Sequence, residues 1–382
     1  MEARVSPQHH QVARAPLLIR RVDAIPVALP LKKPMKMAGV TIDRAHNILV
    51  RIEAQDGTVG WGEAAAAPTM TGDTLGGLQA AVGHLAPLLI GRDAWMRREL
   101  VRALKHALLG NTGAHSAIEM ALLDLAGQAA VLPVIDLIGG AARNAVVPMW
   151  LLGNATPEED IAEARLRERE GFHFFKLKVG VKPLPAEIAG TLAVREALGA
   201  DVPLCADANG GFTLEAARRY AEGTGAAELK FLEQPLAHDD LDGLAALARV
   251  SPVPIGADEA IHSLADVEAH AQRGVGGVSL KLIKLGGMAA AVQAALACER
   301  LGLSVNIAAK IAESSIASAA AMHLACAVPA VGWGVSLTHF YLAEDLVQRP
   351  LEMSAAGVSL PFGGGLGVQV DERAVARLRI SE

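Results

Sequence analysis

Charged residues recur at an even spacing through the middle of the chain, and each stands at the end of a short apolar run. Lys178, Asp207, Glu233, Asp258 and Lys281 are separated by 29, 26, 25 and 23 residues. One strand, one helix and two loops need about this many residues. In a barrel of parallel strands, the functional side chains lie at the carboxyl ends of successive strands. The spacing therefore predicts a (β/α) barrel whose active site includes these five residues.

The region from residue 141 to residue 350 predicts eight strand–helix units, which is the number that closes a barrel. Before it, residues 17–140 hold three strand patterns and then helical patterns, as in an α+β domain. Within them, residues 32–40 are expected to form a loop. Residues 351–382 are too short to fold alone and are expected to pack on the first domain, and residues 1–16 to be a disordered leader. The barrel strands are expected near residues 146–152, 174–178, 202–207, 229–233, 254–257, 277–281, 304–307 and 331–335.

Charge, cysteine content and hydropathy argue against several classes of protein. The net charge is −6 and no basic tract stands out, which argues against nucleic acid as a partner. The three cysteines are odd in number and far apart, which fits a reducing cytoplasm. Residues 1–16 lack the apolar core of a signal peptide. No Asp, Glu, Lys or Arg lies between Glu313 and Glu344, but this stretch is mostly Ala with several Ser and Gly, so we expect a buried helix and strand rather than a membrane span.

The three carboxylates on neighbouring strand ends predict a metal site. Asp207, Glu233 and Asp258 offer oxygen ligands only, which suits Mg²⁺, with Mn²⁺ as an alternative. The competing interpretation is that each carboxylate merely caps the helix that follows its strand, but caps are more often Ser, Thr or Asn and need no flanking lysines. Glu259 is expected to support the site from the other side of its strand, and Asn209 to share a side with Asp207 if the strand continues.

Lysines flank the carboxylates. Lys176 and Lys178 alternate along one strand end, so both are expected to point inward, where close like charges would lower the lysine pKa toward that of a usable base. Lys281 lies four units further on, across the barrel; Lys284 competes with it but follows the strand, so Lys281 is preferred. Lysines on two sides of a metal indicate proton transfer at the carbon next to a metal-bound carboxylate, through an enediolate. The alternative is a surface strand with two lysines.

Together these residues resemble the mandelate racemase/muconate lactonizing enzyme family of the enolase superfamily, and within it the muconate cycloisomerase subgroup. The resemblance implies an α/β fold, with a (β/α)7β-type TIM barrel and an α+β N-terminal capping domain completed by the C-terminal tail. It also makes a homo-oligomer the expected assembly. It covers nearly the whole chain and is carried by Trp61-Gly62-Glu63, Gly110-Asn111-Thr112, Ala121-Leu122-Leu123-Asp124, Leu137-Ile138-Gly139-Gly140, Phe175-Lys176-Leu177-Lys178, Glu233-Gln234-Pro235, Asp258-Glu259 and Gly365-Leu366-Gly367.

The resemblance also implies roles for individual residues. Lys178 would be the acid/base on one face of the substrate, Lys176 would tune it, and Lys281 would serve the other face. Residues 34–42 and 64–74 match the two loops of the capping domain that would set specificity. Mg²⁺ would be bound by Asp207, Glu233 and Asp258, and Glu313 would be a further catalytic residue at the end of strand seven. The substrate is expected to contact Met37, Thr69 and Trp333. It is also expected to contact Lys310, an extra cation near the mouth of the site, where residues 308–313 depart from the pattern of muconate cycloisomerases.

The residues leave several reactions open for a small carboxylate substrate. Trp333-Gly334 is similar to the eighth strand of muconate cycloisomerases, and the Asp-x-Asp pair of dipeptide epimerases is absent there. The first hypothesis is therefore a cycloisomerase that closes a muconate to a lactone. The second is a racemase or epimerase of an amino-acid derivative or dipeptide. The third is a dehydratase or an o-succinylbenzoate synthase-like β-elimination, and the non-enzymatic alternative is a barrel kept for binding or structure.

Overall fold

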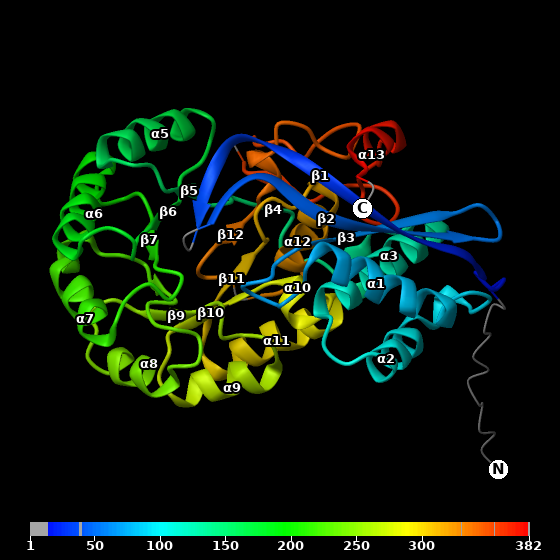
Figure 1. Cartoon of the computed structure of the whole chain (residues 1–382), viewed down its shortest axis with the longest axis horizontal. Helices are drawn as coiled ribbons and strands as arrows, with labels where there is room; N and C mark the ends of the chain where they lie inside the picture. Colours follow the sequence, from blue (N-terminus) through cyan, green and yellow to red (C-terminus); the bar gives the residue numbers. More distant parts are fainter. Residues whose placement is uncertain (1–13, 38–39, 330, 355, 381–382) are drawn as a thin grey trace, which may run out of the picture.

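The computed structural model describes residues 14–37, 40–329, 331–354 and 356–380. Figure 1 shows a ring of strands and helices beside a sheet and helix assembly formed by the beginning and the end of the chain. The predicted leader lies mostly outside the described residues. Its last residues are held in place, because the Arg14 guanidinium lies 3.2 Å over the Trp95 ring and Trp95 Nε1 donates to the Ala15 carbonyl.

An antiparallel sheet of three strands begins the described fold: β1 (Ile19–Met37), β2 (Val40–Ala54) and β3 (Val59–Ala65), in the order β1-β2-β3. The described residues of the predicted loop at 32–40 belong instead to a long hairpin, because Met35 to Met37 of β1 pair with Val40 to Ile42 of β2 after a register shift. Lys33 on this hairpin donates to Asn154 and Glu163 of the barrel. The hairpin therefore reaches across to the barrel (Figure 1).

Helices α1 (Leu75–Leu85) and α3 (Thr112–Ala130) pack on this sheet, while α2 (Arg97–Ala107) and α4 (Val134–Ile138) pack on α3. The 3₁₀ turns η1 (Ala86–Leu88) and η2 (Ala94–Met96) lie between α1 and α2. Helix α3 packs directly on β3, where Gly60 and Gly62 leave room for it. A Cβ at Gly62 would lie 1.9 Å from the Ala117 carbonyl oxygen, so no other residue fits this close approach. Helix α3 begins at Thr112, directly after its N-cap Asn111.

Eight parallel strands form the barrel, in the order β12-β11-β10-β9-β8-β7-β6-β5. Met149 N donates to the Val335 carbonyl at 2.7 Å, which closes the ring between its first and last strands. The predicted first strand at 146–152 is divided, because β4 (Ala145–Val146) pairs with β13 (Val358–Ser359) in the tail. The strands are β5 (Trp150–Leu152), β6 (Phe175–Lys178), β7 (Leu204–Asp207), β8 (Leu232–Glu233), β9 (Ile255–Ala257), β10 (Gly277–Leu280), β11 (Ser304–Ala308) and β12 (Val335–Ser336).

Helices connect the strands and surround the ring (Figure 1). Most begin at a side chain that accepts from the first turn, as at Thr156, Thr213, Asp240, Ser263 and Ser314. Among the described residues, the last strand is followed by η4 (His339–Tyr341) and no barrel helix, so the (β/α)7β prediction is confirmed. The helices are α5 (Pro157–Arg169), α6 (Leu184–Leu198), α7 (Leu214–Gly223), α8 (Leu241–Ala248), α9 (Leu264–Gln272), α10 (Leu282–Leu285), α11 (Met288–Leu301) and α12 (Ser315–Ala327), with the turn η3 (Gly225–Ala227).

The C-terminal tail returns to the N-terminal sheet, as predicted. Ile380 N donates to the Pro26 carbonyl of β1 at 3.0 Å after helix α13 (Glu372–Leu378). Leu366 N donates at 2.8 Å to the buried Asp124 carboxylate of α3. The chosen domain boundaries stay a prediction. The uncharged stretch before Glu344 holds the buried helix α12 and strand β12, and within the described residues no helix has the length and apolarity to cross a membrane.

Candidate active site

Two of the predicted lysines share the inner face of β6. Lys176 and Lys178 are two residues apart and Lys178 pairs in register with Asp207 on β7. Lys178 Nζ donates to Asp207 Oδ2 and to Asn209 Oδ1, both at 2.6 Å. Lys176 is buried and forms an ion pair with Glu233 on β8, two strands away from β6. The alternative of a surface strand with two solvated lysines is therefore wrong.

The three predicted carboxylates lie on adjacent strand ends. Asp207 and Glu233 are register partners across β7 and β8, and Glu233 pairs with Gly256, two residues before Asp258. All three are buried. They do not cap the helices that follow, whose N-caps at Thr213, Asp240 and Ser263 are separate residues. The three carboxylates therefore lie on adjacent strand ends, and their role as metal ligands stays a prediction.

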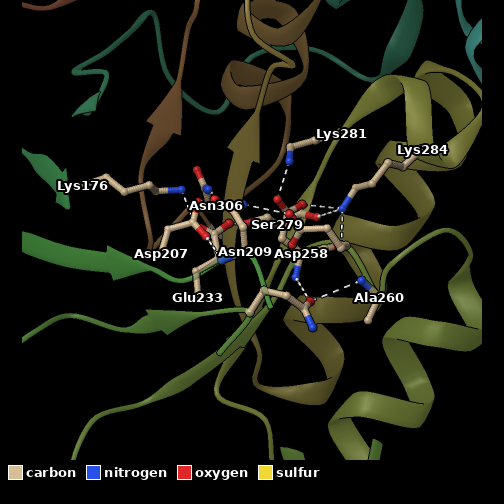
Figure 2. Close-up of polar contacts among 12 residues, drawn as sticks. Lys176, Asp207, Asn209, Glu233, Asp258, Ala260, Ser279, Lys281, Lys284 and Asn306 are labelled. Atoms are coloured by element: carbon tan, nitrogen blue, oxygen red, sulfur yellow. Dashed lines mark hydrogen bonds and ion pairs between the residues drawn. The ribbon is translucent and has the colours of Figure 1, made fainter. Parts of the chain in front are cut away.

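Two further lysines reach Asp258 from the end of the neighbouring strand β10 and from α10 (Figure 2). Lys281, at the end of β10, forms an ion pair with Asp258 Oδ2. Lys284, on α10, lies 2.5 Å from Asp258 Oδ1 and also donates to the Ser279 carbonyl at 3.1 Å. Lys284 is fully buried, whereas Lys281 lines a cavity. The preference for Lys281 over Lys284 as the residue that faces the substrate agrees with these positions.

The lysine pKa values differ from the sequence prediction. Burial opposes protonation of Lys176, but the charges of Glu233 and Asp207 outweigh it and raise the pKa of Lys176. Burial also opposes protonation of Lys281, but the charge of Asp258 outweighs it and raises the pKa of Lys281. At Lys284 the effect of burial exceeds that of Asp258, and the pKa is lowered. The prediction that the Lys176–Lys178 pair lowers the lysine pKa is therefore wrong for Lys176, because the facing carboxylates have more influence than the neighbouring ammonium group.

Three uncharged side chains hold the carboxylates in place. Ser279 Oγ donates to Glu233, and Asn306 Nδ2 donates to Ser279 Oγ at 3.0 Å from the paired position on β11. Gln234, with φ of 34°, accepts from Asp258 N at 2.9 Å. None of the three was predicted from the sequence to have a role in the site. Ser279 stands two residues before Lys281, and this inward alternation was the available signal for it.

Asn209 and Glu259 support the site as expected. Asn209 Nδ2 donates to Glu259 Oε1 at 2.8 Å, and Asn209 N donates to Asp207 Oδ1 at 3.0 Å. Burial, together with the charges of Asp258 and Asp207, raises the pKa of Glu259 to about 7. Asn209 therefore links a carboxylate of the site to a second acid at its rim.

Two cavities meet above these residues. An inner cavity of about 60 Å³ is lined by the lysines, the three carboxylates and apolar residues such as Leu151 and Tyr341. An outer cavity of about 590 Å³ lies between strand β2, the loop 66–75 and the barrel loops. Thr69 lines the outer cavity, as predicted for a substrate contact. Lys310 lines both cavities.

Two other predicted site residues, Trp333 and Glu313, are not brought to the cavities. Trp333 precedes β12 inside the barrel, where its ring stacks on Phe231 at a centroid distance of 4.2 Å; it lines neither cavity and packs the barrel instead. Glu313 is buried and also lines neither cavity. Burial and the nearby Glu63 raise the pKa of Glu313 to about 8. Met37 ends β1, and its side chain lies outside the described part of the chain.

Glu63 joins the N-terminal sheet to the barrel beside the site, and the sequence analysis gave it no role beyond its motif. Its buried carboxylate accepts from Asn47 Nδ2, from the Ser314 amide and hydroxyl, and from the Ala317 amide. Burial raises the pKa of Glu63, and the hydrogen bonds at the N-terminus of α12 partly offset this effect. Glu63 thereby fixes the segment that carries Lys310 and Glu313.

The donor set fits a hard divalent cation in its chemistry, since it consists of three buried carboxylates on neighbouring strand ends. Among the residues that the structure describes, no three His, Cys, Asp or Glu side chains converge closely enough to enclose an ion. The physical reason is that each carboxylate turns to a lysine: Asp207 to Lys178, Glu233 to Lys176, and Asp258 to Lys281 and Lys284. A cation at this position would have to compete with these ion pairs.

Comparison with known proteins identifies the class. Residues 19–139 match the "Mandelate racemase / muconate lactonizing enzyme, N-terminal domain" family, and residues 159–374 match the "Enolase C-terminal domain-like" family. The protein therefore belongs to the mandelate racemase/muconate lactonizing enzyme family of the enolase superfamily, and it is an enzyme of that superfamily.

Its relatives include more than one activity. A chloromuconate cycloisomerase of Pseudomonas putida is 33% identical over 359 residues, which cover 92% of this chain and 96% of that protein. An L-Ala-D/L-Glu epimerase of Bacillus subtilis (strain 168) is 31% identical over 355 residues, with the same two coverages of 92% and 96%. A crystal structure of muconate lactonizing enzyme from Pseudomonas fluorescens, complexed with muconolactone, superposes with a TM-score of 0.92 at 29% identity, covering 96% of this chain and 100% of that one.

Proposed function

We propose that the protein is a Mg²⁺-dependent cycloisomerase that converts cis,cis-muconate, or a substituted relative, to a lactone, with Mn²⁺ as an alternative metal. The observation that carries the proposal is the placement of Lys178 and Lys281 at one inner cavity, on opposite sides of three buried carboxylates. The similarity to cycloisomerases over nearly the full length supports it.

In this proposal Asp207, Glu233 and Asp258 hold the cation. A divalent cation bound there would polarise a substrate carboxylate and stabilise negative charge on it. One carboxylate oxygen of the substrate adds to the double bond conjugated with the other carboxylate, and the lactone C–O bond forms as that π bond opens to an enolate. Lys178 then delivers a proton to the enolate α-carbon. Lys176 holds Glu233 in place, and Lys281 contributes positive charge from the opposite face.

A second candidate function is racemisation or epimerisation of an amino-acid derivative or dipeptide. It needs one base on each face of the α-carbon, and Lys178 and Lys281 are both available to the inner cavity. The similarity to a dipeptide epimerase favours keeping it. A β-elimination could use the same enolate. A barrel without catalytic activity is not part of the proposal, because the chain belongs to an enzyme superfamily.

The test follows the ultraviolet absorbance of cis,cis-muconate with purified protein, first with Mg²⁺ and then with a chelator. We expect loss of the diene absorbance that depends on the metal and that returns when Mg²⁺ is restored. Absence of any loss would contradict the cycloisomerase assignment. The epimerase would then be tested by incubating N-acyl amino acids and dipeptides in D₂O and measuring α-deuteration by NMR.

Assembly and location belong to the proposal as well. The assembly common in the family supports a homo-oligomer. A reducing cytoplasm is supported by three cysteines that are free thiols in the structure, Cys205, Cys298 and Cys326. Sedimentation of the purified protein would measure the number of subunits.

A further inference from the structure

Lys310 is a buried cation that the proposed reaction leaves without a role. It is 9% exposed, and it lies on the loop after β11. Its Nζ donates to the Ile311 carbonyl at 3.1 Å, and no carboxylate in the described part of the chain forms an ion pair with it. A buried charge is normally paired, because removing it from water is costly. Lys310 therefore lacks the counterion that its position calls for.

The position of Lys310 shows where such a counterion would come from. Lys310 lines both cavities, together with Met70, Asn209 and Ile311, so it stands where the two meet. The inner cavity of about 60 Å³ holds only a few water-sized groups. It can take one carboxylate and the atoms next to it. The rest of a substrate must extend past Lys310 into the outer cavity of about 590 Å³.

We propose that Lys310 pairs with a second, distal carboxylate of the substrate, so that the site selects dicarboxylates over monocarboxylates. The inference rests on the proposed function only in assuming that the first carboxylate binds in the inner cavity beside Asp207, Glu233 and Asp258. It holds for a muconate and equally for an amino-acid derivative with an acidic far end. The distal carboxylate supplies the counterion, and Lys310 sets the specificity.

Other charged groups near the junction do not replace Lys310. Arg44, His46 and His238 line the outer cavity but are exposed, so solvent screens their charges. Glu259 at the rim is acidic and would repel a carboxylate. Burial, with the charges of Lys281 and Lys178 partly offset by Glu313, lowers the pKa of Lys310 to about 8, so the side chain remains mostly charged at pH 7.

The test measures equilibrium binding, which does not depend on turnover. Adipate, a saturated six-carbon dicarboxylate, and its monomethyl ester are titrated by calorimetry into the full chain with Mg²⁺ at pH 7. We expect the wild type to bind adipate about 30-fold or more tightly than the ester, because the ester leaves Lys310 buried and unpaired. We expect Lys310→Met and Lys310→Gln to bind the two compounds within about threefold of each other.

Lys230→Met is the matched control. Lys230 is exposed and precedes β8, at the opposite end of the barrel from the site, so the wild-type preference should be unchanged. A preference that survives in both Lys310 variants would overturn the inference. So would a wild type that does not distinguish the two compounds, or that binds neither. If muconate is not consumed but the adipate preference depends on Lys310, the cycloisomerase assignment fails and the dicarboxylate site stands.

Discussion

Lys178 Nζ lies 2.6 Å from Asp207 Oδ2, so the proposed acid–base residue is ion-paired with a proposed metal ligand. The same relationship joins Lys176 to Glu233 and Lys281 to Asp258. Each proposed ligand therefore already has a positive partner. A divalent cation bound there would compete with the lysines for the carboxylates. Its positive charge would also disfavour the protonated form of the lysines.

Removal of the metal should therefore stop catalysis without unfolding the protein. A chelator is expected to lower kcat by at least about a thousandfold, because the charge that stabilises the transition state is lost. The lysines keep the buried carboxylates neutralised, so the Tm of the chelated protein should lie within a few degrees of that of the Mg²⁺ form. Activity assays and calorimetry on the same sample measure both quantities. Unfolding on chelation would show that the lysines do not neutralise the site.

Although Lys284 does not line the inner cavity, replacing it should lower the thermal stability of the protein. The Lys284→Met variant leaves Asp258 with one lysine and leaves the Ser279 carbonyl without this donor. Breaking a buried ion pair by removing one partner costs about 3–5 kcal/mol, so we expect a Tm lower by roughly 5 °C. Thermal unfolding with the exposed Lys230→Met variant as the control measures the effect. A Tm within 2 °C of the wild type would refute it.

Replacing Lys310 should raise stability, in contrast to replacing Lys284. Burial lowers the pKa of Lys310 from 10.5 to about 8, so the unfolded chain binds more protons than the folded one between these values. The stability of the wild type therefore rises with pH across this window, and the buried charge costs up to about 3 kcal/mol below it. Lys310→Met should be more stable than the wild type at pH 7, and the difference should shrink toward pH 10.5.

Denaturant unfolding of the wild type and Lys310→Met at pH 7, 8.5 and 10 measures this difference. A variant that is less stable than the wild type at pH 7, or a difference that does not change with pH, would show that Lys310 is already satisfied within the protein. Taken with the adipate titration, the expected result would mean that the charge is retained for binding at the expense of stability.

Local patterns were enough to predict the barrel and most of the site. The spacing of Lys178, Asp207, Glu233, Asp258 and Lys281 follows from one strand–helix unit per step, and the alternation along β6 directs two lysines inward. These features depend on neighbouring residues along the chain. They could therefore be inferred without knowing how distant parts pack.

Features that depend on distant contacts could not be predicted. The lysine pKa values follow from the number of carboxylates that surround each ammonium group in space, and the sequence does not give that number. Trp333 lies before its strand, below the site, because Gly256 and Gly277 on other strands leave room for its ring. The hairpin at residues 32–40 depends on pairing between β1 and β2 that a mixed apolar and basic sequence does not reveal.

The central claim is that Lys178 transfers a proton at the carbon next to a carboxylate. Incubation of cis,cis-muconate with Mg²⁺ and enzyme in D₂O, followed by NMR of the product, tests it most directly. The wild type should give a lactone with one deuterium at that carbon, because the Lys178 ammonium exchanges with solvent. Lys178→Ala, folded as judged by its Tm, should give no product. Turnover by Lys178→Ala, or a wild-type lactone without deuterium, would contradict the account.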